Sequence, residues 1–100
     1  MEGPSDKPTI TRHDQGARGE YHAAVPGSEA IGRLTYQRRG NVLVADHTLV
    51  PPEIGGKGVA IRLVEALVEG ARKDGDLIVP QCSYVDDAFR RHPECADLRA

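Results

Sequence analysis

A change of hydrophobic period on either side of a glycine-rich segment constrains the fold of this chain more than any other feature. Before the segment, residues 42–45 are apolar on both faces of an extended chain that continues to Val50, as expected of a central strand. After it, apolar residues recur with the spacing of one helix face, in the row Val59, Leu63, Leu67 and Ala71 and the adjacent row Ala60, Val64 and Val68. A strand, a turn and a long helix therefore follow one another, and the helix is expected to bury both rows against the sheet.

Proline and glycine mark the ends of these elements. Pro51 and Pro52 end the central strand because neither residue can donate a backbone hydrogen bond to a neighbouring strand. Gly75 is placed to stop the helix, and the apolar run 77–79 that follows is a short strand. Because such crossovers are right-handed and return to the same sheet, we expect the two strands to run parallel. A second, shorter helix is predicted over residues 85–92.

Two further strands are predicted before the central one. Residues 20–25 are followed by Pro26 and Gly27, a strong turn signal. Residues 30–37 place Leu34 and Tyr36 on one face, as the period of two in a strand requires, and residues 38–41 form a hairpin turn. Residues 1–17 show no sustained periodicity and are predicted to be a flexible N-terminal tail.

These elements predict one small domain over residues 18–100, of the α/β (α+β) class. Its small sheet is expected to be mostly antiparallel, with one parallel βαβ crossover, and to be covered by one long and one short helix.

Charge and composition exclude several classes of function. The formal net charge is -2 without a long run of one sign, which argues against a nucleic-acid partner. No apolar stretch approaches the roughly 20 residues of a membrane span. Two cysteines do not make a disulfide framework, so we expect a cytoplasmic protein with free thiols. The four histidines are scattered and no metal site is predicted.

The glycine-rich turn, Gly55-Gly56-Lys57-Gly58, is the first candidate site. Glycine lets main-chain N–H groups approach a ligand without side-chain obstruction. The first N–H groups of a helix have no internal partner and carry partial positive charge, so the turn is suited to a phosphate or pyrophosphate. Lys57 adds a full charge nearby. Glycines between a strand and a helix are also common without any ligand, and this turn matches neither a Walker loop nor a Rossmann fingerprint.

Residues 44–60 resemble the acyl-CoA motif of the GNAT acyltransferase superfamily, Arg/Gln-x-x-Gly-x-Gly/Ala after a strand. Gly58 and Ala60 match its last two small positions, and Gly55 stands where Arg or Gln is usual. Over about residues 18–98 the chain is similar to the short, stand-alone N-acetyltransferase-like proteins of that superfamily. The segments that carry this similarity are Gly32-Arg33-Leu34-Thr35-Tyr36, Asp46-His47-Thr48, Pro51-Pro52-Glu53, Pro80-Gln81-Cys82-Ser83-Tyr84-Val85 and Phe89-Arg90-Arg91-His92-Pro93-Glu94.

The resemblance implies a minimal GNAT-like fold that binds acetyl-CoA or coenzyme A. The backbone at the end of the central strand is implied to pair with the pantetheine arm, and the loop amides are implied to hold the pyrophosphate. The cofactor-binding residues implied in this way are Leu49, Val50, Gly55, Gly56, Lys57, Gly58, Val59 and Ala60.

Three side chains are candidates for the chemistry of acyl transfer. Cys82 follows the last predicted strand, where this fold splays its strands, and a thiol there can accept an acetyl group if a helix N-terminus lowers its pKa; the alternative is a small buried hydrophobe. Tyr84 either protonates the leaving thiolate or packs against the cofactor. His47 either acts as a base or bonds a backbone carbonyl.

The resemblance therefore implies an N-acetyltransferase that acts on a small-molecule or peptidic amine, as a monomer or weak dimer. Close relatives carry Glu where this chain has Leu49, and the large N-terminal helices of full-size members, which usually form an acceptor site, are missing. These differences keep two alternatives open: a non-catalytic CoA-binding module, and an interaction protein that retains only the fold.

Overall fold

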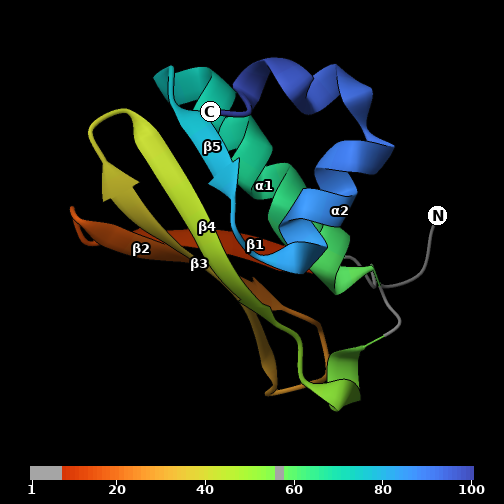
Figure 1. Ribbon diagram of the computed structural model, residues 1–100. Coiled ribbons are helices and arrows are strands. Elements are labelled where there is room, and N and C mark those ends of the chain that lie inside the picture. Colours follow the sequence, from red (N-terminus) through yellow and green to blue (C-terminus); the bar gives the residue numbers. More distant parts are fainter. Residues whose placement is uncertain (1–7, 56–57) are drawn as a thin grey trace, which may run out of the picture.

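The computed structural model describes residues 8–55 and 58–100, which form a mixed α/β fold with one sheet and helices packed on one of its faces (Figure 1). The strands are β1 (Thr9–Asp14), β2 (Arg18–Ala24), β3 (Ile31–Arg39), β4 (Val42–Leu49) and β5 (Leu77–Pro80). The helices are α1 (Val59–Asp74) and α2 (Ser83–Arg91), with the 3-10 segments η1 (Pro52–Ile54) and η2 (Pro93–Leu98). The order is β1-β2-β3-β4-β5, antiparallel except for the parallel β4–β5 pair, so the predicted fold class is confirmed.

For residues 8–17, strand β1 corrects the prediction that residues 1–17 are a flexible tail. It pairs with β2 from Thr9 opposite Ala24 to Asp14 opposite Gly19, and the sheet therefore has five strands instead of the four predicted. The sequence of β1 does not show the apolar alternation of a strand, because Arg12 occupies a half-buried position that an apolar residue usually takes. The Arg12 guanidinium donates to Asp74 at 2.9 Å and to the Tyr36 hydroxyl at 3.2 Å. Residues 1–7 lie outside the described part of the chain.

The helix α1 covers the centre of the sheet with the first apolar row seen in the sequence and with Val64 of the second row, whose other members, Ala60 and Val68, are only half-buried. Its fully or nearly fully buried residues are Val59, Leu63, Val64, Leu67 and Ala71. At Gly32 in β3 a Cβ atom would lie 2.9 Å from Val59 Cγ1, so glycine permits the close approach of helix and strand. Gly75 ends α1 in the left-handed conformation, with φ of 76°, as predicted.

The strands β4 and β5 separate beyond a short paired region. They pair from Val42 opposite Leu77 to Ala45 opposite Pro80. The chain then leaves β5 to begin α2, and the N–H of Cys82 donates to the carbonyl of Ala45 at 2.8 Å. Because β4 continues to Leu49, its last residues have no β5 neighbour, and one edge of that segment is left open.

Leu67→Ala is expected to destabilise the protein by about 2–5 kcal/mol, because it removes a fully buried side chain from the middle of the interface between α1 and the sheet. Urea unfolding followed by circular dichroism measures the change. Leu49→Ala is the matched control, since Leu49 is 54% exposed and its truncation is expected to change stability by less than about 0.5 kcal/mol. A loss below about 1 kcal/mol for Leu67→Ala would contradict this account of the core.

Candidate functional site

The loop between β4 and α1 is anchored by a buried side chain, and the helix N-terminus that follows it has no side-chain cap among the described residues. Ile54 in η1 is fully buried, and the N–H of Gly55 donates to the carbonyl of Pro52 at 3.1 Å. Gly58 precedes α1 in the left-handed conformation, with φ of 70°, and no side chain of the described residues caps the helix there. The first N–H groups of α1 are therefore available to a ligand. Gly56 and Lys57, predicted to bind the cofactor, lie outside the described residues.

A cavity of about 300 Å³ opens at this helix N-terminus. It is lined by residues from the end of β4, the loop, the first turn of α1 and the start of α2, namely Val50, Gly55, Gly58, Val59, Ala60, Ile61 and Tyr84. The structure thus brings Tyr84 to five of the residues predicted to bind the cofactor. Ile61 is the lining residue that sequence reasoning missed, because it lies outside both apolar rows of the helix.

The open edge of β4 gives this cavity an extension along the sheet. The side chain of Leu49 is 54% exposed, whereas Thr48 lies opposite the buried Leu34 and so faces the side of the sheet that the helices cover. An extended ligand arm can lie in the gap between β4 and β5 and hydrogen-bond to the backbone of β4, in the manner of an added strand.

Cys82 lies where β5 ends and α2 begins, at the inner end of that gap. Its Sγ is 3.5 Å from the Thr48 hydroxyl oxygen. Burial opposes ionisation of the thiol, but hydrogen bonding to Thr48 and to the first backbone amides of α2 outweighs it, so the pKa of Cys82 is lowered. The sequence gives no sign of the contact between Thr48 and Cys82, because the two residues are brought together only by the parallel pairing of β4 and β5.

Comparison with known proteins identifies the family of this chain. Residues 20–98 match the family described as GCN5-related N-acetyl-transferase. The chain belongs to this family. It is also similar to the NMR solution structure of a GCN5-like protein from Staphylococcus aureus, with a TM-score of 0.68 and 26% sequence identity over 92% of this chain and 87% of that chain. The fold of this GCN5-related N-acetyltransferase is that of a minimal GNAT domain.

Tyr84 is the second residue of α2 and is 38% exposed beside the cavity. Burial raises the pKa of its hydroxyl. The charge of Arg91 lowers this pKa and that of Asp87 raises it, both by less than burial does. A phenol is protonated at neutral pH in any case, so the Tyr84 hydroxyl can donate its proton to a group in the cavity.

The structure does not place His47 close to Cys82. Its partner across the β3–β4 pair is Thr35, which places the exposed imidazole on the sheet face opposite to Thr48. Beside it, a β-bulge turns Asp46 toward β3, where Asp46 accepts hydrogen bonds from Thr35 at 2.5 Å and Gln37 at 3.0 Å. Burial opposes the ionisation of Asp46, but these hydrogen bonds outweigh it and lower the pKa of the carboxyl group.

Two classes of site are absent from the part of the chain that the structure describes. Over residues 8–55 and 58–100, no cluster of three or more His, Cys, Asp or Glu side chains is suited to hold a metal ion. Within the same residues, neither helix is long and apolar enough to cross a membrane.

Proposed function

We propose that this GCN5-related N-acetyltransferase binds acetyl-CoA in the cavity at the N-terminus of α1 and transfers the acetyl group to an amine. The observation that carries the proposal is the convergence, in that single cavity, of the amide-rich start of α1 with the end of β4 and with Tyr84. Free amides at a helix N-terminus suit a diphosphate, and the open edge of β4 suits the amide-containing pantetheine arm.

The residues present fit coenzyme A at two places. The backbone N–H groups of Gly58, Val59 and Ala60 are assigned to the diphosphate, together with Gly56 and Lys57 from the sequence motif. The open edge of β4 at Leu49 and Val50 is assigned to the pantetheine arm. When bound, acetyl-CoA supplies an activated thioester as the acetyl donor.

Two side chains of this chain support the transfer chemistry. Hydrogen bonding to Thr48 and to α2 amides favours the thiolate form of Cys82, which is the nucleophilic form. The hydroxyl of Tyr84, whose pKa burial raises further, is protonated at neutral pH, and Tyr84 is assigned the donation of a proton to a departing thiolate. His47 faces the other side of the sheet, where its exposed imidazole is accessible to an incoming amine.

A second function, a CoA-binding module without turnover, is favoured by one observation. At the position where close relatives carry a glutamate, Leu49 exposes an apolar side chain that cannot accept a proton. Calorimetric titration with CoA and acetyl-CoA, paired with thiol release against a panel of small and peptidic amines, separates the two functions. Turnover of any amine supports the acetyltransferase, and binding without turnover supports the module. The absence of binding at millimolar CoA contradicts both.

Thr48→Val is expected to raise the pKa of Cys82, because the substitution removes the hydroxyl group that helps to stabilise the thiolate. The rate of alkylation by iodoacetamide follows the thiolate fraction, so its midpoint in the wild-type protein falls at a lower pH than for an ordinary cysteine. In Thr48→Val this midpoint moves to higher pH. Thr48→Ser, which keeps a hydroxyl, is the control and is expected to retain most of the wild-type profile. Identical profiles for all three proteins would contradict the role of Thr48.

A further inference from the structure

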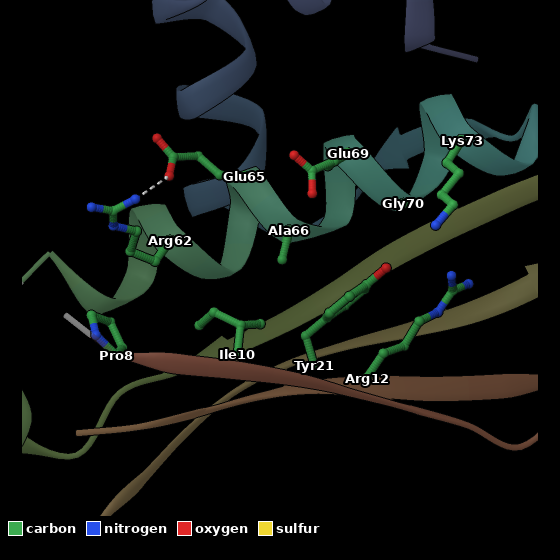
Figure 2. A pocket seen from close by; sticks show the side chains of 10 residues that line it. All are labelled: Pro8, Ile10, Arg12, Tyr21, Arg62, Glu65, Ala66, Glu69, Gly70 and Lys73. Atoms are coloured by element: carbon green, nitrogen blue, oxygen red, sulfur yellow. Dashed lines mark hydrogen bonds and ion pairs between the residues drawn. The ribbon is translucent and has the colours of Figure 1, made fainter. Parts of the chain in front are cut away.

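Both faces of the β4–β5 pair are apolar, but the helices cover only one of them. On the covered face, Leu43, Ala45 and Ile78 are fully buried and belong to the hydrophobic core. Figure 2 shows the covered face at the other edge of the sheet, where Ile10 and Tyr21 point toward α1 beside a cavity of about 480 Å³. Neither α1 nor α2 lies on the opposite face of the sheet (Figure 1).

Four branched apolar side chains lie on the uncovered face. Because successive residues of a strand point to opposite faces, Val42 and Val44 of β4 and Leu77 and Val79 of β5 point away from the helices. Val42 is paired with Leu77 and Val44 with Val79, so the four side chains form one surface, the β4–β5 patch. Among the described residues, Val44 is the one buried apolar side chain that does not belong to the hydrophobic core, and the other three are half-buried.

The parallel pairing of β4 and β5 makes an uncovered apolar face unusual. Parallel strands are normally buried on both faces, because helices pack on each side of the sheet. Residues 1–7 contain a single long apolar side chain, that of Met1, and so do not supply a cover that matches four branched residues. The second cover is therefore expected to come from another molecule.

Arginine side chains border the β4–β5 patch on the side of β3 and β2. Arg39 is paired with Val42, and Arg18 is paired with Gln37, which is itself paired with Val44. Both arginines are exposed, and neither forms an ion pair with any residue that the structure describes. Since neighbouring strands lie about 5 Å apart, both guanidinium groups are within reach of a partner that sits on the patch.

The carboxylates on the same face do not neutralise these arginines, because they have partners of their own. Glu20 lies 3.6 Å from the guanidinium of Arg33, and Asp46 accepts hydrogen bonds from Thr35 and Gln37. The uncovered face thus has an apolar centre with a cationic border. An apolar centre with a polar rim is the usual anatomy of a protein-binding surface.

We propose that the β4–β5 patch docks an amphipathic helix of a partner protein, with acidic residues on the flank that meets Arg18 and Arg39. A helix on this face adds the second helical layer of an α/β sheet. A second copy of this chain fits less well, because a two-fold interface through the patch brings the arginines of both copies together without a carboxylate to neutralise them. A nucleic-acid backbone fits less well because it leaves the apolar centre uncovered. This docking surface is independent of the proposed acetyl transfer.

Titration of the whole chain with synthetic peptides, followed by two-dimensional NMR, tests the proposal. The probe is about 14 residues long, with leucine once per turn on one helix face and glutamate on both flanks. We expect saturable binding with a dissociation constant below about 1 mM, and chemical-shift changes centred on Arg39, Val42, Val44 and Val79. The same peptide with lysine in place of glutamate is expected to bind at least about tenfold more weakly. Equal affinity for the two peptides, chemical-shift changes centred on α1 or α2, or no binding at millimolar peptide would each overturn the proposal.

Charge reversal separates docking from a structural role of the arginines. In the double variant Arg18→Glu, Arg39→Glu the preference is expected to reverse, so that the lysine peptide binds at least about tenfold more tightly than the glutamate peptide. Lys73→Glu makes the same change of charge at an exposed residue of α1 and is expected to keep the wild-type preference. A wild-type preference in the double variant would overturn the role of the arginines.

Val79→Thr tests the apolar centre, because threonine keeps the shape of valine and adds a hydroxyl group. The substitution is expected to weaken binding of the glutamate peptide about fivefold or more, and to leave CoA affinity unchanged. Sedimentation of the wild-type chain tests the other occupant. Dimerisation that Val79→Thr abolishes would assign the β4–β5 patch to a second copy of this chain and overturn the proposed partner helix.

Discussion

Gly58→Glu is expected to weaken the binding of CoA and acetyl-CoA by about 100-fold or more. Gly58 lines the cavity immediately before α1, and a carboxylate there would repel the diphosphate and occupy the space next to the first amides of the helix. The left-handed backbone at this position, with φ of 70°, also disfavours any residue with a Cβ atom. Calorimetric titration of CoA against the variant measures the loss.

The control for Gly58→Glu is Gly40→Glu. Gly40 has φ of 63° in the turn between β3 and β4, and a Cβ atom there would meet no atom within 4 Å. Both variants carry the same backbone strain, of about 1–2 kcal/mol, and the same added charge. Gly40→Glu is expected to lower the melting temperature and to leave CoA affinity unchanged. If Gly58→Glu binds CoA as tightly as Gly40→Glu does, the diphosphate does not rest on this helix.

The sequence predicts most of the fold because its strongest signals are local. The apolar rows and Gly75 predict a helix whose bounds agree almost residue for residue with those of α1, and the prolines that follow β4 mark its end. The parallel pairing of β4 and β5 follows from the helical crossover between them, because α1 returns the chain to the end of the sheet where β4 began. The start of α2 is less well predicted, because Ser83 and Tyr84 carry no apolar periodicity.

The elements that the sequence fails to predict depend on contacts between distant residues. Strand β1 is stabilised by Arg12, whose partners Tyr36 and Asp74 lie far along the chain, so its residues have no apolar pattern of their own. The same limit applies to the site. Glycine chemistry predicts an anion site before α1, but the contact of Thr48 with Cys82 and the position of His47 on the other face depend on strand register.

Cys82→Ser tests the role that the site assigns to the thiolate, and it is expected to lower acetyl transfer by at least about 100-fold. Brief exposure of the wild-type protein to acetyl-CoA is expected to leave an acetyl mass adduct on Cys82. Serine is close to isosteric and is a preferred residue before a helix, so α2 should form at least as well in the variant. The much lower acidity of a hydroxyl leaves serine un-ionised at neutral pH, and both the adduct and turnover are lost.

Cys95→Ser provides the matched control, since Cys95 is the other free thiol and is half-buried within η2, beside α1 and α2 and away from the β4–β5 gap. The Cys95→Ser variant is expected to keep the adduct on Cys82 and wild-type turnover. Two results argue against a covalent role in different ways. An adduct on Cys95 alone would show that acetylation follows thiol exposure instead of the geometry around Thr48. Full activity in Cys82→Ser would limit Cys82 to packing at the start of α2. Direct attack by the amine on the bound thioester would then be the remaining route, because no other described thiol reaches the gap where β4 and β5 separate.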